Sequence, residues 1–340
     1  MSITATAWYQ VNPSFVEPDV LLQINQVSNA WDLVAERKMR VKLGEGDLAV
    51  YIKRADVRTK VSAGQSPTNQ LPSGSVVLDV ISAPTYLVQA RGEYDHHDLA
   101  NAGRWGISGV QAEDLVMEQG IAQFSRNALL YGVDPSNGEG LVNAANAFAI
   151  TLPPDSLNNT TVLTYDSGEM GFFLLQQMLA MKIRMYQLGS PSRFSIVGPQ
   201  RVLGQFAMVN VVQLVQFQRT GAGSETTAGL IESIVDRNGD AVDWGYDDTL
   251  IGKGAGGTDM VIISVPEIVN NQGSPGTDTN AFARLTPNLS AAVLQYADMA
   301  APRKIQSPLP RGAVDVLREW RITPGWAPRP QALTLISMPY

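Results

Sequence analysis

The stretch "EYDHHD", residues 93–98, contains side chains that could bind a metal ion or act in acid-base catalysis. It holds both histidines of the chain, His96 and His97, between Asp95 and Asp98. Imidazole nitrogen combined with carboxylate oxygen is common zinc coordination. Neighbouring residues, however, point about 100° apart on a helix and to opposite faces of a strand, so one ion seldom recruits both. We therefore expect a polar junction between two elements, with no metal and no cofactor.

Two other segments contain residues found in catalytic or phosphate-binding sites, but the neighbouring sequence does not support either function. The loop "GKGAGGTD", residues 252–259, lacks the Gly-Lys-Ser/Thr ending of a phosphate-binding loop and runs into a strand instead of a helix. The neighbouring carboxylates Asp247 and Asp248 could serve in glycoside hydrolysis, but a turn is the simpler interpretation. The sequence predicts no catalytic residue, and we expect that the protein is not an enzyme.

The composition bounds the class of protein. A chain of 340 residues predicts two domains, or one domain with a large insertion. Charged residues make up 17%, below the usual quarter, which leaves neutral surface for contact with other chains. A net charge of -7 argues against a protein whose main task is to bind nucleic acid. The absence of cysteine excludes disulfides and thiolate metal sites. We expect no secretion signal and no membrane span.

A long hairpin is predicted between residues 50 and 94. The second half of the segment "VYIKRADVRTKV" alternates polar and apolar residues, and the tip "GQSPTNQLPSG" is rich in turn formers. The chain then returns through "VVLDVISAPTYLVQARGEY". A two-stranded ribbon of this length is marginal in water because no sheet or helix covers its apolar face. We expect it to rest on another subunit.

Helical and strand patterns follow the hairpin. A helix is predicted up to Gly132, which is a plausible C-cap, and a second one over residues 169–188. The segment "RFSIVGP", residues 193–199, predicts a buried strand followed by a helix start at Gln200. Strands are also predicted in "DMVIISVPE" and in the C-terminal segment after residue 312.

The segment "LLYGVDPSNGEGLVN", residues 129–143, is the most informative part of the sequence. Here the long helix ends, a turn-forming Asp-Pro-Ser-Asn-Gly follows, and Gly140, Leu141, Val142 and Asn143 close the loop. Together with the N-terminal arm, the hairpin and the helix, this order resembles the major capsid proteins of tailed bacteriophages with the Hong Kong 97-like fold. The resemblance implies an α+β fold with an N-terminal arm, an extended β-hairpin loop, a peripheral domain with a long spine helix, and an axial domain.

The resemblance also implies a division of the chain. The expected parts are the N-terminal arm at 1–43, the extended loop at 44–92, the peripheral domain with the spine helix at 93–199, the axial domain at 200–310, and C-terminal strands returning to the peripheral domain at 311–340.

Charge is unevenly placed along the chain. Residues 36–60 contain eight basic and four acidic residues, whereas residues 223–260 contain eight acidic and two basic ones. Basic and acidic segments of one chain can pair between copies, although a solvated face is the commoner meaning of such runs. The residues that we expect at a subunit interface are Lys53, Arg54, Asp56, Arg58, Lys60 and Arg91.

The resemblance implies a structural protein that assembles with itself, as pentamers and hexamers, into an icosahedral head shell enclosing phage double-stranded DNA. Portal, scaffolding or decoration proteins would be further partners, and no sequence-specific DNA contact is expected. The protein would be assembled in the bacterial host cytoplasm and reside in the virion. The alternatives are the shell of an encapsulin-like compartment, or a soluble α/β hydrolase or binding protein, and electron microscopy of the purified protein separates them.

Overall fold

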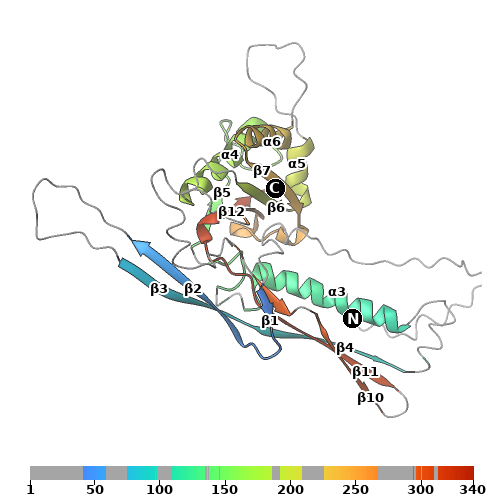
Figure 1. Ribbon diagram of the computed structural model, residues 1–340. Coiled ribbons are helices and arrows are strands. Elements are labelled where there is room, and N and C mark those ends of the chain that lie inside the picture. Colours follow the sequence, from blue (N-terminus) through green and yellow to red (C-terminus); the bar gives the residue numbers. More distant parts are fainter. Residues whose placement is uncertain are drawn as a thin grey trace, which may run out of the picture.

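The computed structural model gives the arrangement of most of the chain. The residues that it describes are 41–58, 75–95, 97, 109–134, 136, 138–144, 146–185, 192–208, 226–266, 294, 296–299, 301–309 and 313–340. They form a mixed helix and sheet structure with a projecting ribbon and two larger bodies (Figure 1). The expected N-terminal arm is described only from Val41 onward, and the tip of the hairpin lies outside the described residues.

The first body is built on a five-stranded sheet. Its strands are β1 (Val41–Leu43), β4 (Tyr86–Tyr94), β9 (Ala297–Met299), β10 (Arg303–Pro308) and β11 (Val314–Ile322). Strand β11 is the centre, since it pairs antiparallel with both β10 and β4, while β1 pairs parallel with β9. Residues in β4 alternate between exposed and partly buried positions, as expected for a strand with one solvated face.

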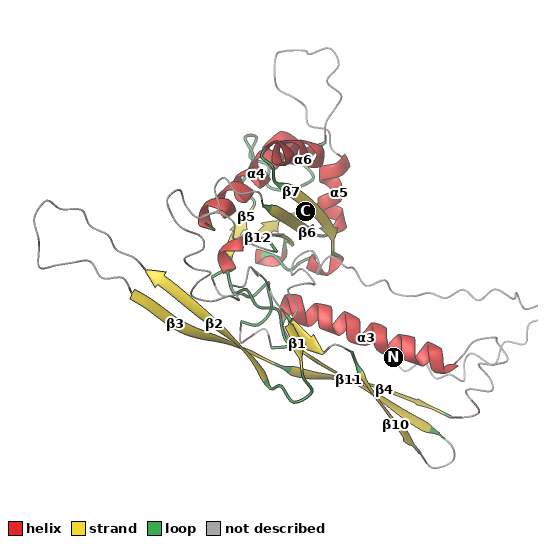
Figure 2. Cartoon of the chain, in the orientation of Figure 1, coloured by secondary structure: helices red, strands yellow, loops and turns green. Residues whose placement is uncertain are grey.

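Helix α3 (Gly109–Tyr131) lies along one face of this sheet (Figure 2). A Cβ at Gly92 would lie 3.4 Å from Met117, so the helix and β4 approach closely there. Lys304 and Arg318 reach up from the sheet to Asp114 and Glu118 of the helix, with N to O distances of 2.8 Å and 2.7 Å. At 23 residues α3 is about 34 Å long, and it confirms the predicted helix ending at Gly132.

The projecting ribbon consists of β2 (Ala49–Arg58) and β3 (Ser75–Pro84), paired antiparallel from Ala49 with Pro84 to Arg58 with Ser75. The hairpin prediction is confirmed for these two strands. After Pro84 the chain leaves the ribbon at Thr85 and enters the first sheet as β4, which pairs with β11 instead of with β2. The ribbon therefore extends outward from an edge of the first body (Figure 1).

The second body contains the main hydrophobic core. Its sheet has the order β5 (Phe148–Thr151), β12 (Leu333–Met338), β8 (Asp259–Ser264), β6 (Arg193–Gly198) and β7 (Ala241–Tyr246). The helices of this body are α4 (Ser167–Arg184), α5 (Gln200–Met208) and α6 (Thr227–Arg237), with 3₁₀ turns η4 (Asp248–Leu250), η5 (Ala255–Gly257) and η7 (Pro330–Ala332). Strands β8 and β12 are buried at every residue, which explains their nearly continuous apolar sequence.

Local patterns in this body are confirmed. The predicted strand in "RFSIVGP" is β6, the helix start at Gln200 begins α5, and the strand in "DMVIISVPE" is β8. The second predicted helix is α4, which begins two residues earlier than expected because Asp166 caps it by accepting a hydrogen bond from the Glu169 backbone N–H.

The two sheets cut across the ranges expected for the peripheral and axial domains. Strands β5 and β6, inside 93–199, belong to the second sheet, whereas β9 and β10, inside 200–310, pair within the first sheet. The C-terminal strands separate as well, since β11 joins the first sheet and β12 the second. The physical reason is that strand pairing joins segments far apart in sequence, which local patterns do not encode.

Candidate functional site

The turn that follows α3 is the junction of the molecule. After Gly132 the chain doubles back, so that the Leu141 N–H donates to the Leu129 carbonyl at 3.1 Å and the Val142 N–H to the Leu130 carbonyl at 3.0 Å. The Asn143 side-chain amide donates to the backbone carbonyls of Tyr131 and Glu139, at 3.1 Å and 3.0 Å. The bonds to Leu129, Leu130 and Tyr131 satisfy carbonyls that the end of a helix otherwise leaves without donors.

Two glycines make this junction sterically possible. Gly132 and Gly140 have positive φ angles, 78° and 87°, which side chains rarely adopt. The backbones also touch, because a Cβ built on Gly140 would lie 2.4 Å from the Gly132 nitrogen. The Gly-Leu-Val-Asn motif singled out in the sequence is thus explained by its Gly, which allows contact with the helix end, and by its Asn, which caps that end.

The junction is tied to the root of the ribbon by Glu139. The Tyr86 hydroxyl, at the start of β4, donates to Glu139 Oε1 at 2.6 Å, and the Asp134 backbone N–H donates to Oε2 at 3.0 Å. The hydrogen bond to the carboxylate raises the pKa of Tyr86 to about 12 from its usual 10.0. On the other side of the root, an Arg321 guanidinium nitrogen donates to the Asp47 carbonyl and the Thr85 hydroxyl, at 3.0 Å and 3.1 Å.

The junction is tied to the second body by a buried ion pair. Arg126, near the end of α3, donates to Asp247 Oδ1 at 3.0 Å, and the side chains are 9% and 0% exposed. At the last residue of α3 the Tyr131 hydroxyl donates to the Thr249 carbonyl at 2.8 Å, and burial raises the pKa of that hydroxyl. Helix α3 is therefore held at its C-terminal end by the second body and along its length by the first sheet.

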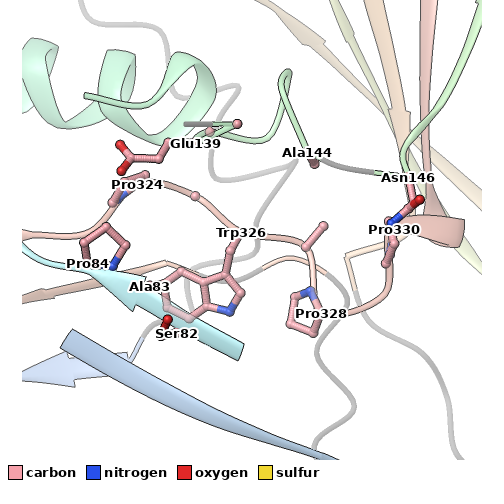
Figure 3. Close-up of a pocket in the computed structure, with 14 residues that line it drawn as sticks. Ser82, Ala83, Pro84, Glu139, Ala144, Asn146, Pro324, Trp326, Pro328 and Pro330 are labelled. Carbon is pink, nitrogen blue, oxygen red and sulfur yellow. The ribbon is translucent and has the colours of Figure 1, made fainter. Parts of the chain in front are cut away.

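A cavity of about 500 Å³ opens beside the junction (Figure 3). Trp326 belongs to the proline-rich segment that follows β11, and its ring lies in the cavity wall, pointing toward Ser82 and Ala83 of β3. Among the residues that the structure describes, the buried indole Nε1–H of Trp326 has no hydrogen-bond acceptor. The carboxylate in the wall, Glu139, is engaged by Tyr86, so the cavity offers an apolar surface instead of an acid-base pair.

Of the histidine stretch at 93–98, the structure describes residues 93–95 and 97. The His97 backbone N–H donates to Asp95 Oδ1 at 2.8 Å, which is a local turn directly after β4, while His96 lies outside the described residues. Across the described parts of the chain, no cluster of three or more His, Asp or Glu side chains could hold a metal ion. Within the same residues, no helix has both the length and the apolarity to cross a bilayer.

The structure places the expected interface residues in different surroundings. Lys53 is exposed on β2, opposite Val80 of β3, and Arg54 is opposite Asp79 in the register. The side chains of Arg54, Asp56 and Arg58, and the whole of Lys60, lie outside the described part of the structure. Arg91 is on the outer face of the first sheet and pairs with Asp315 of its own chain at 2.8 Å. The structure thus brings Lys53 and Arg54 onto one ribbon and sets Arg91 apart from them.

The interface residues expected from the sequence do not include three large apolar side chains that are exposed in the described part of the ribbon. Tyr51, Leu78 and Val80 are 71%, 79% and 56% exposed. The alternation of polar and apolar residues in both strands already indicated an apolar face. The interface prediction, however, was based on the charged residues of these strands.

Several solved structures resemble this chain over nearly its whole length. The capsid of Myoviridae phage XM1 has a TM-score of 0.67 at 10% identity, covering 95% of this chain and 96% of that chain. The capsid of the native GTA particle has a TM-score of 0.56 at 11% identity, with 100% and 99% covered. The mature capsid of bacteriophage PhiM1 has a TM-score of 0.55 at 13% identity, with 96% and 92% covered.

Because the matches cover nearly the whole chain, they show that the overall fold is shared. Because the sequence identities are low, they show the fold alone. No protein-family model and no curated protein sequence matches the chain. The mixed helix and sheet class and the Hong Kong 97-like fold that the resemblance implied are confirmed. The division into an arm, an extended loop, a peripheral domain and an axial domain stays a prediction.

Proposed function

From a fold shared along its whole length with tailed-phage capsid proteins of the Hong Kong 97 type, we propose that this chain is a major capsid protein. Copies of it would assemble into the icosahedral shell that encloses phage double-stranded DNA. The observation that carries the proposal is the match over at least 95% of this chain and 92% of three capsid chains. The protein then acts as a structural component of the virion and not as an enzyme.

The shape of the subunit supports this function. A closed shell requires contacts in which one surface of a subunit meets a different surface of the next, because such heterologous contacts close into rings. The ribbon β2–β3 and the open outer face of the first sheet offer two such surfaces, on opposite sides of the junction (Figure 1). The ribbon alone would be marginally stable in water, so a neighbouring copy is the natural support for it.

The domains that the resemblance implies can be assigned according to the two sheets. We assign the first sheet with α3 to the peripheral domain, the second sheet with α4, α5 and α6 to the axial domain, and the ribbon to the extended loop. This proposal follows strand pairing instead of sequence ranges. Helix α3 is then the spine helix, and its end at the junction is where all three parts meet.

The ribbon residues expected at the subunit interface, Lys53, Arg54, Asp56, Arg58 and Lys60, remain part of this proposal. Arg91 would contribute to a contact as one half of its ion pair with Asp315, since that pair is already formed within the chain. DNA would be held by enclosure without base-specific contacts, which suits a chain of net charge -7. Portal, scaffolding and decoration proteins would be additional partners of the shell.

Electron microscopy of the purified protein tests the proposal. We expect closed particles of uniform size that are far larger than one subunit, either on expression or after concentration. Nucleic acid inside particles from infected or co-expressing cells supports a phage shell, whereas an enclosed enzyme cargo points to a compartment. Protein that stays monomeric at all concentrations and salt conditions contradicts the function.

A further inference from the structure

The cavity beside the junction is hollow because the residues around it are small or rigid. Its described walls contain four prolines, three glycines and three alanines, whose side chains do not reach across it. Three segments that are distant in sequence supply these residues, namely the end of β3, the turn after α3 and the segment after β11 (Figure 3). The cavity volume of about 500 Å³ falls within the roughly 300–1,000 Å³ of pockets that hold small molecules.

The walls of the cavity are fixed by their own packing. Gly140 and Gly325 lie directly against the end of α3, since a Cβ on either would lie 2.4 Å from the Gly132 nitrogen or from the Leu129 carbonyl oxygen. The prolines fix the backbone φ angle at their own positions. A pocket that is already formed binds a molecule without the free-energy cost of ordering its walls.

One side chain in the wall presents an unused hydrogen-bond donor. The indole Nε1–H of Trp326 is buried, and no acceptor among the described residues reaches it. Trp320, for comparison, donates its indole N–H to the Met299 carbonyl at 2.9 Å. A buried donor without an acceptor costs the free energy of its lost hydration, and buried tryptophans usually avoid this cost. Because the ring of Trp326 lies in the cavity wall, an acceptor on a molecule in the cavity would satisfy the donor.

The charges around the cavity favour a neutral molecule. Glu139 is the acidic side chain in the wall, and its two oxygens already accept hydrogen bonds from the Tyr86 hydroxyl and the Asp134 backbone N–H. No lysine or arginine from the described part of the chain lines the cavity, so an anion would be repelled without compensation. A cation would give up its hydration for walls that are mostly apolar.

We propose that this cavity binds a small, neutral and mostly apolar molecule that accepts one hydrogen bond from Trp326 Nε1–H. A ketone, ester or ether oxygen on a flat ring system is the fitting chemistry, because a ring packs on the indole and on the proline rings while the oxygen meets the N–H. The bound molecule contacts all three wall segments and so stabilises their arrangement. The inference goes beyond the proposed function, since the site is complete within one subunit.

Two naphthalenes that differ in one acceptor test the site. 2-Acetylnaphthalene carries a ketone oxygen, whereas 2-ethylnaphthalene has nearly the same shape without it. Equilibrium dialysis against the purified 340-residue chain measures both dissociation constants. We expect saturable binding of both compounds at one molecule per chain.

Trp326→Phe separates the hydrogen bond from the packing, because phenylalanine keeps an aromatic ring and lacks the N–H. The measured quantity is the dissociation constant of the ethyl compound divided by that of the acetyl compound, in wild type and in the variant. The difference in hydrophobicity between the two compounds cancels in this comparison. We expect the ratio to be at least about fivefold smaller in Trp326→Phe, as loss of one buried hydrogen bond requires.

Variants that fill the cavity test its location. Ala144→Leu and Ser82→Leu add bulk from two different wall segments, and Ser82 is exposed, so its replacement is compatible with folding. We expect each variant to weaken the binding of both compounds at least about tenfold, because the space is taken. Ser307→Leu is the matched control at an exposed position of β10 outside the cavity, and it should change both constants less than about twofold. Circular dichroism verifies that each variant is folded, and Ser82→Leu alone is sufficient if Ala144→Leu does not fold.

Three results would overturn the inference. One is the absence of saturable binding to the wild-type chain. Another is undiminished binding to the folded cavity-filling variants, which would place the molecule elsewhere. The third is an unchanged ratio in Trp326→Phe, which would remove the donor assigned here. None of these results bears on the shell function, which electron microscopy tests separately.

Discussion

At the scale of single residues, Gly140 is a position in the described structure that combines a positive φ with a close backbone approach. A Cβ there would lie 2.4 Å from the Gly132 nitrogen, well inside van der Waals contact, at a φ of 87°. We expect Gly140→Ala to destabilise the subunit by at least about 3 kcal/mol. Gly120→Ala is the matched control, because this helical glycine has open space around its Cβ position and the change should stabilise α3 by about 0.5–1 kcal/mol. Urea unfolding of both variants measures the difference, and equal stabilities would contradict this account of the junction.

The hydrogen bond between Tyr86 and Glu139 gives a prediction for alkaline pH. The folded-state pKa of Tyr86, about 12, lies above its usual 10.0, so the neutral hydroxyl is favoured in the folded protein. The stability that it contributes is therefore complete below pH 10 and is lost as the pH rises from 10 towards 12. We expect Tyr86→Phe to cost about 1 kcal/mol at pH 8 and progressively less above pH 10. A constant difference between the two proteins across this range, measured by thermal unfolding, would show that the bond is not formed.

The ion pair of Arg126 and Asp247 should be worth far more to the subunit than the pair of Arg91 and Asp315. Removal of Arg126 leaves a carboxylate that is 0% exposed without its charge partner, whereas the Arg91 side chain is 61% exposed. We expect Arg126→Ala to cost about 3 kcal/mol and Arg91→Ala less than about 1 kcal/mol. Denaturant midpoints of the two variants provide the measurement. A similar small loss for both would mean that the buried ion pair contributes little to holding α3 on the second body.

At the scale of elements, the ribbon should be dispensable for folding and required for assembly. The tip at residues 64–74 lies outside the described residues, and strands β2 and β3 pack mainly on each other. Replacing this tip by a short Gly-Ser turn should leave the helix content and the melting temperature within about 2 °C of wild type. Assembly should require a higher protein concentration, as followed by light scattering. Loss of the helical circular dichroism signal would place the ribbon within the folding core instead.

The elements also show how far sequence reasoning reaches. The apolar positions of α3, among them Met117, Ile121 and Ala128, recur at helical spacing and are buried, so the helix and its glycine end could be predicted. Strand β10, "RKIQSP", was missed because charged residues and a proline depress strand propensity, and pairing with β11 overrides it. The separation of β11 from β12 into different sheets depends on contacts across the chain, and the junction cavity depends on three segments that are distant in sequence.

At the scale of the whole molecule, the two bodies should differ in local stability. The main core cluster lies in the second body, around side chains such as Leu174, Phe194 and Ile263, whereas the sheet of the first body buries few large residues under α3. We therefore expect backbone amides of β10 and of the first turns of α3 to exchange with solvent faster in free subunits than those of β8. Hydrogen exchange with mass spectrometry should also show that assembly slows the first group much more than the second. Uniform protection across both bodies before assembly would contradict this expectation.

The direct passage from ribbon to sheet has a mechanical consequence. Strand β3 ends at Pro84 and β4 begins at Tyr86, so a pull on the ribbon passes along the chain into β4. Strand β4 is joined to β11 over nine register pairs, from Tyr86 with Ile322 to Tyr94 with Val314. Because interstrand hydrogen bonds run perpendicular to the strands, tension along β4 loads them together in shear instead of opening them one at a time. A sheet stretched in this direction distributes the force over all of its interstrand hydrogen bonds. In a closed shell, outward pressure from the contents would be resisted in the same way.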